Sequence, residues 1–336
     1  MGSLVRSLGR VGRRHRPVGS SHGSRISRAT RQCRDGGVRY SLQELERATI
    51  FDRIQSKGIW YVNSTVASGR PGTGWGDAFT TIEEAVDTAA AGDYILVAPL
   101  HVETVTAAAG LVLDKAGLKI FGYGNGNRRP QVNFTTAVGA DMDVSAADIL
   151  MYNMRFTGGV DALTGPIDVN AAGFTMVDCV TEDVTGQATD FIVSDANADR
   201  MKLIRWDHRG AAAAGADSAI QITGGDEIVI EDAWIYGNFA AAGIETITTA
   251  QVNLRVYGGA RRPCYIWTKN AADVAITCVT GATGDLGPHI YARLQDDAAN
   301  VTEAFVGDAM RFMQPIMIVN ADGQRNIETN ITASAG

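Results

Sequence analysis

The chain has 336 residues, of which 45% are hydrophobic and 7% aromatic; 38 are glycine, and the formal net charge is −7. A chain of this length can bury a large core, and it has no apolar run long enough to span a bilayer. Few aromatic residues and many glycines favour short strands and tight turns over a helical bundle. The charge is uneven. Residues 1–57 hold 12 Arg and one Lys against four acids, or +9, so the rest of the chain carries −7 minus 9, or −16.

The basic start of the chain predicts an anchoring arm. Residues 1–40 are rich in Arg, Ser and Gly and poor in large apolar groups, so alone they cannot bury enough surface to fold. Residues 41–56 place apolar side chains near helical spacing, which predicts a short linker helix. The partner-binding side chains of the arm, residues 1–57, would be Arg6, Arg10, Arg13, Arg14, Arg16, Arg25 and Arg28. Docking on an acidic protein surface is favoured over nucleic-acid binding, because aromatic side chains for base stacking are missing.

The next stretch predicts a lid on a repetitive structure. Residues 59–62 form an apolar strand, and a Gly-rich loop with Trp75 follows. Two overlapping capping boxes begin at Thr80 and Thr81, and Gly92 is the expected end of the helix that they start. Residues 94–98 are a short β-rich run, typical of a strand buried in a parallel sheet. A lone amphipathic helix ahead of many strands predicts an N-terminal cap over residues 58–110.

This order of features resembles the N-terminal cap of the pectin-lyase-like family of right-handed parallel β-helices. The resemblance is carried by Tyr61-Val62, the Gly/Trp loop, Ala78-Phe79 with Thr81-Ile82, and Gly92-Asp93 before residues 95–97. Residues 99–103 depart from the family pattern, in which Pro-Gly and an aromatic usually follow, so one cue for kinship with the family's enzymes is absent. The motif specifies a fold, while the family spans lyases, hydrolases, phage spikes and inert virion parts.

The remaining chain, residues 111–336, repeats a small polar turn followed by a short alternating strand. The first strand residues recur at nearly regular spacing and are Ile149, Phe174, Met201, Ile228, Val252, Val274, Val301 and Ile327. A second inward position lies two residues later: Met151, Met176, Leu203, Ile230, Leu254 and Ile276. A repeat of about 25 residues with two or three strands and no helix matches one coil of a parallel β-helix. We therefore predict that the first strand residues stack in one interior column.

Asp178, Arg205 and Asp232 are the strongest catalytic candidates, since each stands four residues after a strand start. On stacked coils the two aspartates would lie about 9.6 Å apart, near the upper limit of roughly 9.5 Å for an inverting glycosidase pair. Because Arg205 lies between them, a ladder of ion pairs explains the same residues. We therefore predict no catalytic residue.

Other candidates favour structural roles. Residues 195–199 begin like a calcium loop, but Arg200 stands where the turn glycine belongs, so we predict a turn and no metal site. His101 and Glu103 alternate on one strand face, and Asp207-His208-Arg209 is placed at a coil corner; neither group has a recognisable nucleophile. Cys33, Cys179, Cys264 and Cys278 form no metal pattern, so reduced thiols are expected, with Cys179 and Cys278 buried.

A basic arm joined to an acidic, chemically plain β-helix resembles phage virion components. We expect an all-β, right-handed parallel β-helix that is a structural virion protein of a bacteriophage, a head decoration or fibre-like homotrimer on the particle exterior. The alternative is a tail-associated spike that binds or depolymerises a host surface polysaccharide. A secreted glycan lyase or hydrolase is disfavoured, because residues 1–16 lack the apolar region of a signal peptide. The short coils leave no room for groove-building loops, so we expect no enzyme, no cofactor and no membrane partner.

Overall fold

The structure is a computed structural model that describes residues 57–183, 186–213, 215–269, 274–294, 304–307, 309–319, 325–326 and 331–332. The seven predicted partner-binding arginines, the predicted linker helix, Cys33, and the column residues Val301 and Ile327 lie outside these residues. The division into arm, cap and coils therefore stays a prediction.

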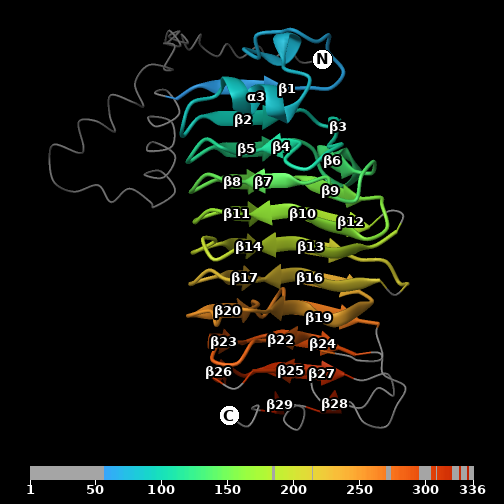
Figure 1. Ribbon diagram of the computed structural model, residues 1–336, viewed down its shortest axis with the longest axis vertical. Coiled ribbons are helices and arrows are strands. Elements are labelled where there is room, and N and C mark those ends of the chain that lie inside the picture. Colours follow the sequence, from blue (N-terminus) through green and yellow to red (C-terminus); the bar gives the residue numbers. More distant parts are fainter. Residues whose placement is uncertain are drawn as a thin grey trace, which may run out of the picture. The chain divides into compact units, whose positions relative to one another are not determined.

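The described chain winds through three sheets, and each full coil contributes one strand to each sheet (Figure 1). Sheet A contains β1 (Ile59–Val62), β2 (Tyr94–Val97), β5 (Lys119–Gly122), β8 (Leu150–Tyr152), β11 (Thr175–Val177), β14 (Lys202–Ile204), β17 (Val229–Glu231), β20 (Leu254–Tyr257), β23 (Thr283–Leu286) and β26 (Ala309–Phe312). Sheet B contains β3 (Val102–Thr104), β6 (Gln131–Phe134), β9 (Arg155–Gly158), β12 (Val180–Asp183), β15 (Asp207–Arg209), β18 (Trp234–Gly237), β21 (Cys264–Thr268), β24 (Ile290–Arg293), β27 (Ile316–Val319) and β28 (Arg325–Asn326). Sheet C contains β4 (Leu111–Val112), β7 (Met142–Val144), β10 (Leu163–Val169), β13 (Ala188–Ser194), β16 (Ala216–Ile222), β19 (Phe239–Thr246), β22 (Ile276–Thr277), β25 (Phe305–Val306) and β29 (Ile331–Thr332).

Neighbouring strands pair in parallel, apart from the antiparallel pair β27 and β28. The predicted all-β parallel β-helix is therefore confirmed. Because side chains alternate along each strand, every coil sends one set into the core and the other set outward. Coils stack at about 4.8 Å, so outward side chains of successive coils lie side by side.

The interior of sheet A confirms the first part of the predicted column. Ile149, Phe174, Met201 and Ile228 have no exposed surface, and backbone hydrogen bonds join each to the strand of the next coil. The second predicted position is equally buried through Ile230. These stacked apolar side chains form one continuous core.

The column prediction is wrong in the later coils. Val252 is 56% exposed, and Leu254 takes the interior position next to Ile228 on the following coil. Ile276 belongs to sheet C, where it pairs with Ile244 and Phe305. An alternating pattern states which side chains point inward, but it does not state which of three sheets a short strand joins. The predicted strand starts Ile228, Val252 and Val274 are separated by the two shortest spacings of the repeat, which was a sign in the sequence that the strands there belong to different sheets.

Helix α3 (Ile82–Thr88) lies at the first coils and packs beside β1, β2 and β4 (Figure 1). Thr81 is its N-cap, and the Glu84 N–H donates to Thr81 Oγ1 at 3.2 Å. The helix ends at Thr88, so Gly92 belongs to the following turn. Glu83 accepts the N–H of Val112 at the edge of sheet C, which keeps that donor from pairing with another chain.

Candidate functional site

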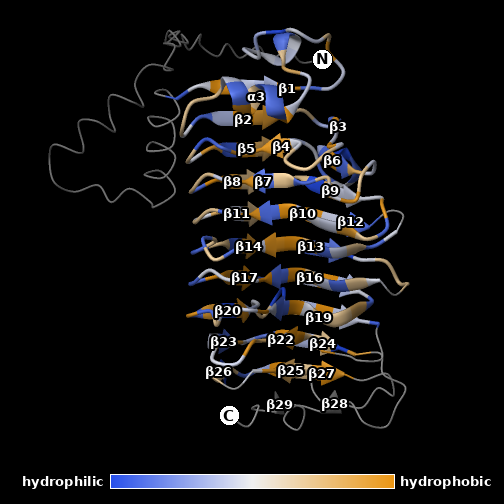
Figure 2. Ribbon diagram, in the orientation of Figure 1, coloured by the Kyte–Doolittle hydropathy of each residue, from blue (hydrophilic) through white to orange (hydrophobic). Residues whose placement is uncertain are grey.

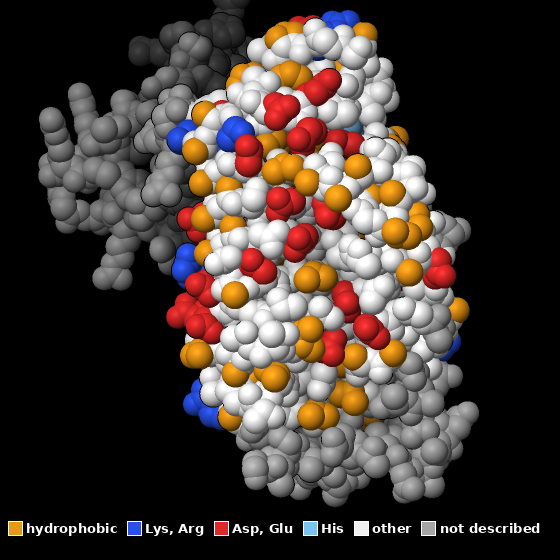
Figure 3. Space-filling model, viewed as in Figure 1, with side chains coloured by type: hydrophobic (Ala, Val, Ile, Leu, Met, Phe, Trp, Pro, Cys, Tyr) orange, Lys and Arg blue, Asp and Glu red, His pale blue; other side chains and the backbone are white. Residues whose placement is uncertain are grey.

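The outer face of sheet C carries stacked carboxylates. Figure 3 shows acidic side chains along the middle of one face, and in Figure 2 hydrophilic residues interrupt β7, β10, β16 and β19. Asp143 and Asp168 are direct cross-strand partners, and the side-chain amide of Asn170 donates to both at 3.0 Å. Burial raises the pKa of Asp168, and the charge of Asp143 raises it further.

A second acidic group lies farther along the same sheet. Asp190, which is 6% exposed, accepts from Ser218 Oγ at 2.6 Å and from Gln221 Nε2 at 3.1 Å. Burial, followed by the charge of Asp190, raises the pKa of Glu245, which pairs with Gln221 on the next coil. Among the described residues, no cluster of three or more His, Cys, Asp or Glu side chains could hold a metal ion. These carboxylates bind neighbouring side chains.

The outer face of sheet B carries aromatic rings on its later coils. Trp234, Tyr265 and Tyr291 occupy one cross-strand column. The rings of Trp234 and Tyr265 stack at 6.0 Å and 9°, and those of Tyr265 and Tyr291 at 5.0 Å and 16°. Because the rings cover one another, the face of Trp234 that is turned away from Tyr265 is the end of the stack.

A pocket of about 550 Å³ opens at that end of the stack. Its lining residues are Asp207, Arg209, Trp234, Arg261, Arg262, Pro263 and Tyr265. Arg262 donates from Nε to the Asp232 carbonyl at 2.8 Å and from Nη2 to Asp207 Oδ1 at 2.7 Å. Arg261 is exposed and forms no ion pair with any residue that the structure describes. The pocket thus combines aromatic walls with three guanidinium groups and one carboxylate.

Strand β15 places the predicted Asp207-His208-Arg209 group, and the prediction of a coil corner is wrong. His208 is 2% exposed, and its ring centroid lies 5.6 to 5.9 Å from those of Phe191, Trp206 and Phe239. Its Nδ1 is 2.9 Å from the hydroxyl of Thr181. Burial lowers the pKa of His208 to about 3. His208 is therefore a neutral core residue, while its two neighbours face the pocket.

Asp178, Arg205 and Asp232 form the predicted column at the corner between sheets A and B. All three adopt positive φ, between 50° and 55°. Arg205 binds both oxygens of Asp178, at 2.6 and 2.8 Å, and this contact lowers the pKa of that carboxyl group. Asp232 accepts the Gly259 N–H at 2.7 Å. The ion pair predicted between Asp178 and Arg205 is confirmed.

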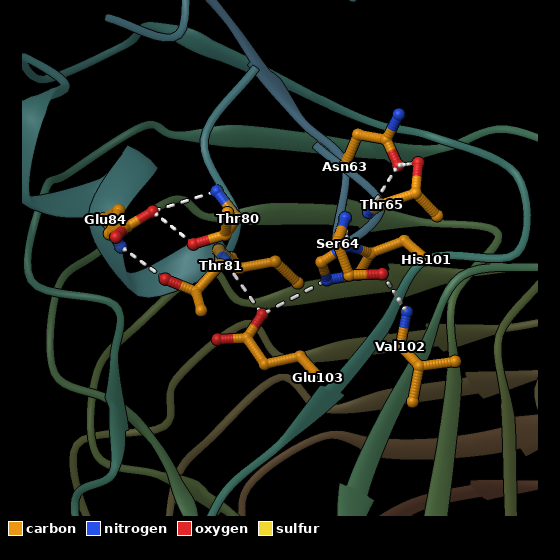
Figure 4. A network of polar contacts seen from close by, with 10 residues as sticks. Asn63, Ser64, Thr65, Thr80, Thr81, Glu84, His101, Val102 and Glu103 are labelled. Atoms are coloured by element: carbon orange, nitrogen blue, oxygen red, sulfur yellow. Dashed lines mark hydrogen bonds and ion pairs between the residues drawn. The ribbon is translucent and has the colours of Figure 1, made fainter. Parts of the chain in front are cut away.

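Two further sequence candidates have structural contacts. His101 and Glu103 lie with Ser64 in the network of Figure 4. The His101 Nδ1 accepts the Ser64 backbone N–H at 3.0 Å, so the ring positions this loop and does not activate the Ser64 hydroxyl. At residues 195–199, the Asn197 N–H donates to Asp195 Oδ1 at 2.6 Å, which forms the predicted turn.

The cysteines that the structure describes are core residues. Cys179, Cys264 and Cys278 are free and buried, as predicted for Cys179 and Cys278, and burial raises the pKa of each to about 12. Within the described residues, no helix combines the length and the apolar character needed to cross a membrane.

The aromatic pocket is not among the sites predicted from the sequence. A signal was present, because Trp234, Tyr265 and Tyr291 are spaced by roughly one repeat. The lining arginines were less accessible to sequence reasoning. Arg261 and Arg262 lie in a loop between β20 and β21, and their distance from β15 depends on the path of that loop.

Two solved structures are similar to this chain, both at low identity. No family model matches the chain, and no curated protein matches it. A rhamnogalacturonan lyase structure is 11% identical with a TM-score of 0.38, over 78% of this chain and 66% of the lyase chain. A pectin methylesterase structure, solved with a hexasaccharide, is 12% identical with a TM-score of 0.33, over 75% of this chain and 93% of the methylesterase chain. The chain thus spans just under two thirds of the lyase chain.

These neighbours correct one expectation. The expectation that the chain is not an enzyme is contradicted, because the two similar structures are a lyase and a methylesterase. At this identity and TM-score, the likeness assigns no reaction to this chain. Neither structure is a phage protein by its description. The strand topology itself shows a parallel β-helix, the fold that the resemblance to the pectin-lyase-like family implied.

Proposed function

We propose that the protein binds a polysaccharide at the pocket over sheet B. One observation carries the proposal: a concave site of about 550 Å³ joins the Trp234 and Tyr265 rings to three arginines. Sugar rings present apolar C–H faces that stack on aromatic side chains, and their hydroxyl groups accept hydrogen bonds from guanidinium groups. A pocket with aromatic walls and a few fixed polar groups is the usual form of a small-ligand site.

The contacts around the pocket hold its polar groups in place before a ligand arrives. Arg262 is fixed by Asp207 and by the Asp232 carbonyl. The Nη1 atom of Arg209 lies 4.0 Å from Oε2 of Glu182, and the same carboxylate also contacts Arg155. A preorganised site loses less side-chain entropy when it binds.

The biological setting that fits this proposal is the surface of a virus particle, as a tail-associated spike that recognises a host glycan. A second candidate is a structural virion protein, homotrimeric and attached to other virion proteins by its N-terminal segment. That candidate rests on the +9 charge of residues 1–57. Mass spectrometry of purified particles, with heads and tails separated, tests both: recovery in tails supports the spike, recovery in heads supports the decoration protein, and absence from particles rejects both.

Binding is tested by titrating the purified chain with polysaccharides and following heat release. Trp234→Ala should weaken binding at least tenfold, because it removes the ring at the end of the stack. Tyr94→Ala is the matched control, since Tyr94 stacks on Phe121 on the outer face of sheet A. Unchanged affinity in a folded Trp234→Ala variant, or absence of binding to any polysaccharide, would overturn the proposal.

A further inference from the structure

A second group of cations and aromatic rings lies beside the pocket on sheet B. The Arg293 guanidinium lies 4.1 Å from the Trp267 ring centroid. Lys269 Nζ is 6.0 Å from the same ring and 5.9 Å from that of Tyr236. The rings of Tyr236 and Trp267 meet edge to face at 4.9 Å. This group, which we call the Trp267 platform, comprises Tyr236, Trp267, Lys269 and Arg293.

The platform and the pocket share strands. Trp267 stands two residues after Tyr265 on β21, and Arg293 also binds the Tyr265 hydroxyl. Two residues along a strand span about 6.6 Å, and one coil adds about 4.8 Å along the axis. Each step is similar in size to one sugar residue, so an extended oligosaccharide of several residues is long enough to reach from one group to the other.

The charges of the two groups have the same sign. In the pocket, Asp207 is already paired with Arg262, while Arg261 has no acidic partner among the described residues. On the outward positions of β18, β21, β24 and β27 there is no carboxylate at all within the described residues. Arg293 is exposed, and among the described residues its guanidinium contacts a ring face and a phenol hydroxyl. Both groups are therefore suited to an anion.

One buried atom also belongs to the platform. The indole Nε1 of Trp267 is buried and has no hydrogen-bond partner among the described residues. A donor that is removed from water without a partner costs free energy.

We propose that the polysaccharide is anionic and lies across both groups, with one acidic group held by Arg261 in the pocket and another by Arg293 on the Trp267 platform. The inference rests on the proposed function and adds the charge and the minimum length of the ligand. A monosaccharide or disaccharide reaches one group, whereas a longer chain reaches both. Affinity should then rise with length more steeply than the number of sugar residues alone explains.

The test titrates the full chain with three sets of oligosaccharides from two to eight residues. Oligogalacturonates carry one carboxylate per residue, hyaluronan oligosaccharides one per disaccharide, and cello-oligosaccharides none. Tryptophan fluorescence and calorimetry report binding. We expect both acidic sets to bind at least tenfold more tightly than the neutral set, with a further tenfold gain between dimers and hexamers.

Variants separate the two groups. Arg261→Gln should weaken dimers and hexamers alike, whereas Arg293→Gln should reduce hexamers to the affinity of dimers and leave dimers unchanged. Arg255→Gln, an exposed arginine on the outer face of sheet A, is the matched control for loss of one charge. Unchanged hexamer affinity in Arg293→Gln would overturn the two-group inference. Equal binding of neutral and acidic sets would overturn the anionic ligand and leave the proposed function intact, whereas absence of binding by every set would reject the proposed function itself.

Discussion

The outer faces of sheets B and C rest on the same core but place opposite chemistry on neighbouring coils. On sheet C, carboxylates are stacked, as in the direct pair Asp143 and Asp168. On sheet B, rings are stacked, as in Trp234 and Tyr265. Stacking at about 4.8 Å makes like charges repel and rings attract. Burial and, after it, the charge of the stacked neighbour Asp143 raise the pKa of Asp168 on sheet C, while the stacked rings build a pocket wall on sheet B.

Outward side chains, and not the coil itself, therefore decide what each face can do. The aromatic stack ends at Trp234, and the cations that line the pocket stand at that end. The carboxylates of sheet C instead accept hydrogen bonds from their own neighbours, such as Asn170 and Gln221. Sheet B therefore leaves a ring face and cations available to a ligand. On sheet C, the polar neighbours offset the repulsion between the carboxylates.

The largest effect is expected from a substitution in the core that sheets B and C share, because it destabilises both faces together. Ile228→Asp places an unpaired charge among fully buried aliphatic side chains, so it should lower the free energy of unfolding by several kcal/mol. We expect the variant to be unfolded at room temperature, with no cooperative transition. Val252→Asp is the matched control, because Val252 is 56% exposed and should change stability by about 0.5 kcal/mol or less. Urea unfolding followed by circular dichroism measures both. Equal losses would reject the register of β17 and β20.

The next largest effect is a loss of stability at low pH, which we expect from the buried His208 behind sheet B. The folded-state pKa of His208, behind sheet B, is about 3 and its ordinary value 6.5, so the unfolded chain takes up this proton first. Its contribution to stability is complete above pH 6.5 and falls toward pH 3, by at most about 1.4 kcal/mol per pH unit. His208→Phe should flatten this loss in unfolding curves measured between pH 7 and 4. A slope equal to that of the wild-type protein would show that His208 is not buried in its neutral form.

A smaller effect tests the aromatic stack itself. Tyr265 has a ring on each side, so Tyr265→Ala removes two stacked pairs and should cost about 1–3 kcal/mol, while also weakening oligosaccharide binding. Tyr265→Phe keeps both rings in contact and loses only the hydroxyl that Arg293 binds. Its unfolding free energy should stay within about 1 kcal/mol of the wild-type value. If both variants lose the same stability, the stacking contribution on sheet B is refuted.

The sequence predicted the core better than the faces, for a physical reason. The interior column could be read from Ile149 to Ile228 because burial demands an apolar residue at every coil. The predicted pairing of Asp178 with Arg205 also followed, since coil spacing alone brings those residues together. The pocket did not follow, because Arg262 reaches Asp207 from 55 positions away through a loop. Outward residues face few packing constraints, so which of them form a site becomes known only when the positions of the loops are known.

The smallest expected effect tests the repulsion on sheet C and has the opposite sign. Burial and then the charge of Asp143 raise the pKa of Asp168, so the folded state holds this proton more tightly than the unfolded chain. The contribution of Asp168 to stability is therefore complete below its ordinary pKa of 3.8 and is lost as pH rises through the raised value. Asp168→Asn removes that loss and still offers an oxygen to Asn170.

At pH 7, Asp168→Asn should stabilise the fold by about 0.2–1 kcal/mol, the usual size of a cross-strand charge effect. At pH 3 the two proteins should unfold alike, because the wild-type carboxyl group is then protonated. Asp226→Asn serves as a control at a carboxyl group that accepts the Val252 N–H on another turn. Thermal unfolding at both pH values measures the difference. A destabilised Asp168→Asn variant at pH 7 would mean that the bond from Asn170 outweighs repulsion by Asp143, and the two outer faces would then differ in residue type but not in the sign of their stacking energy.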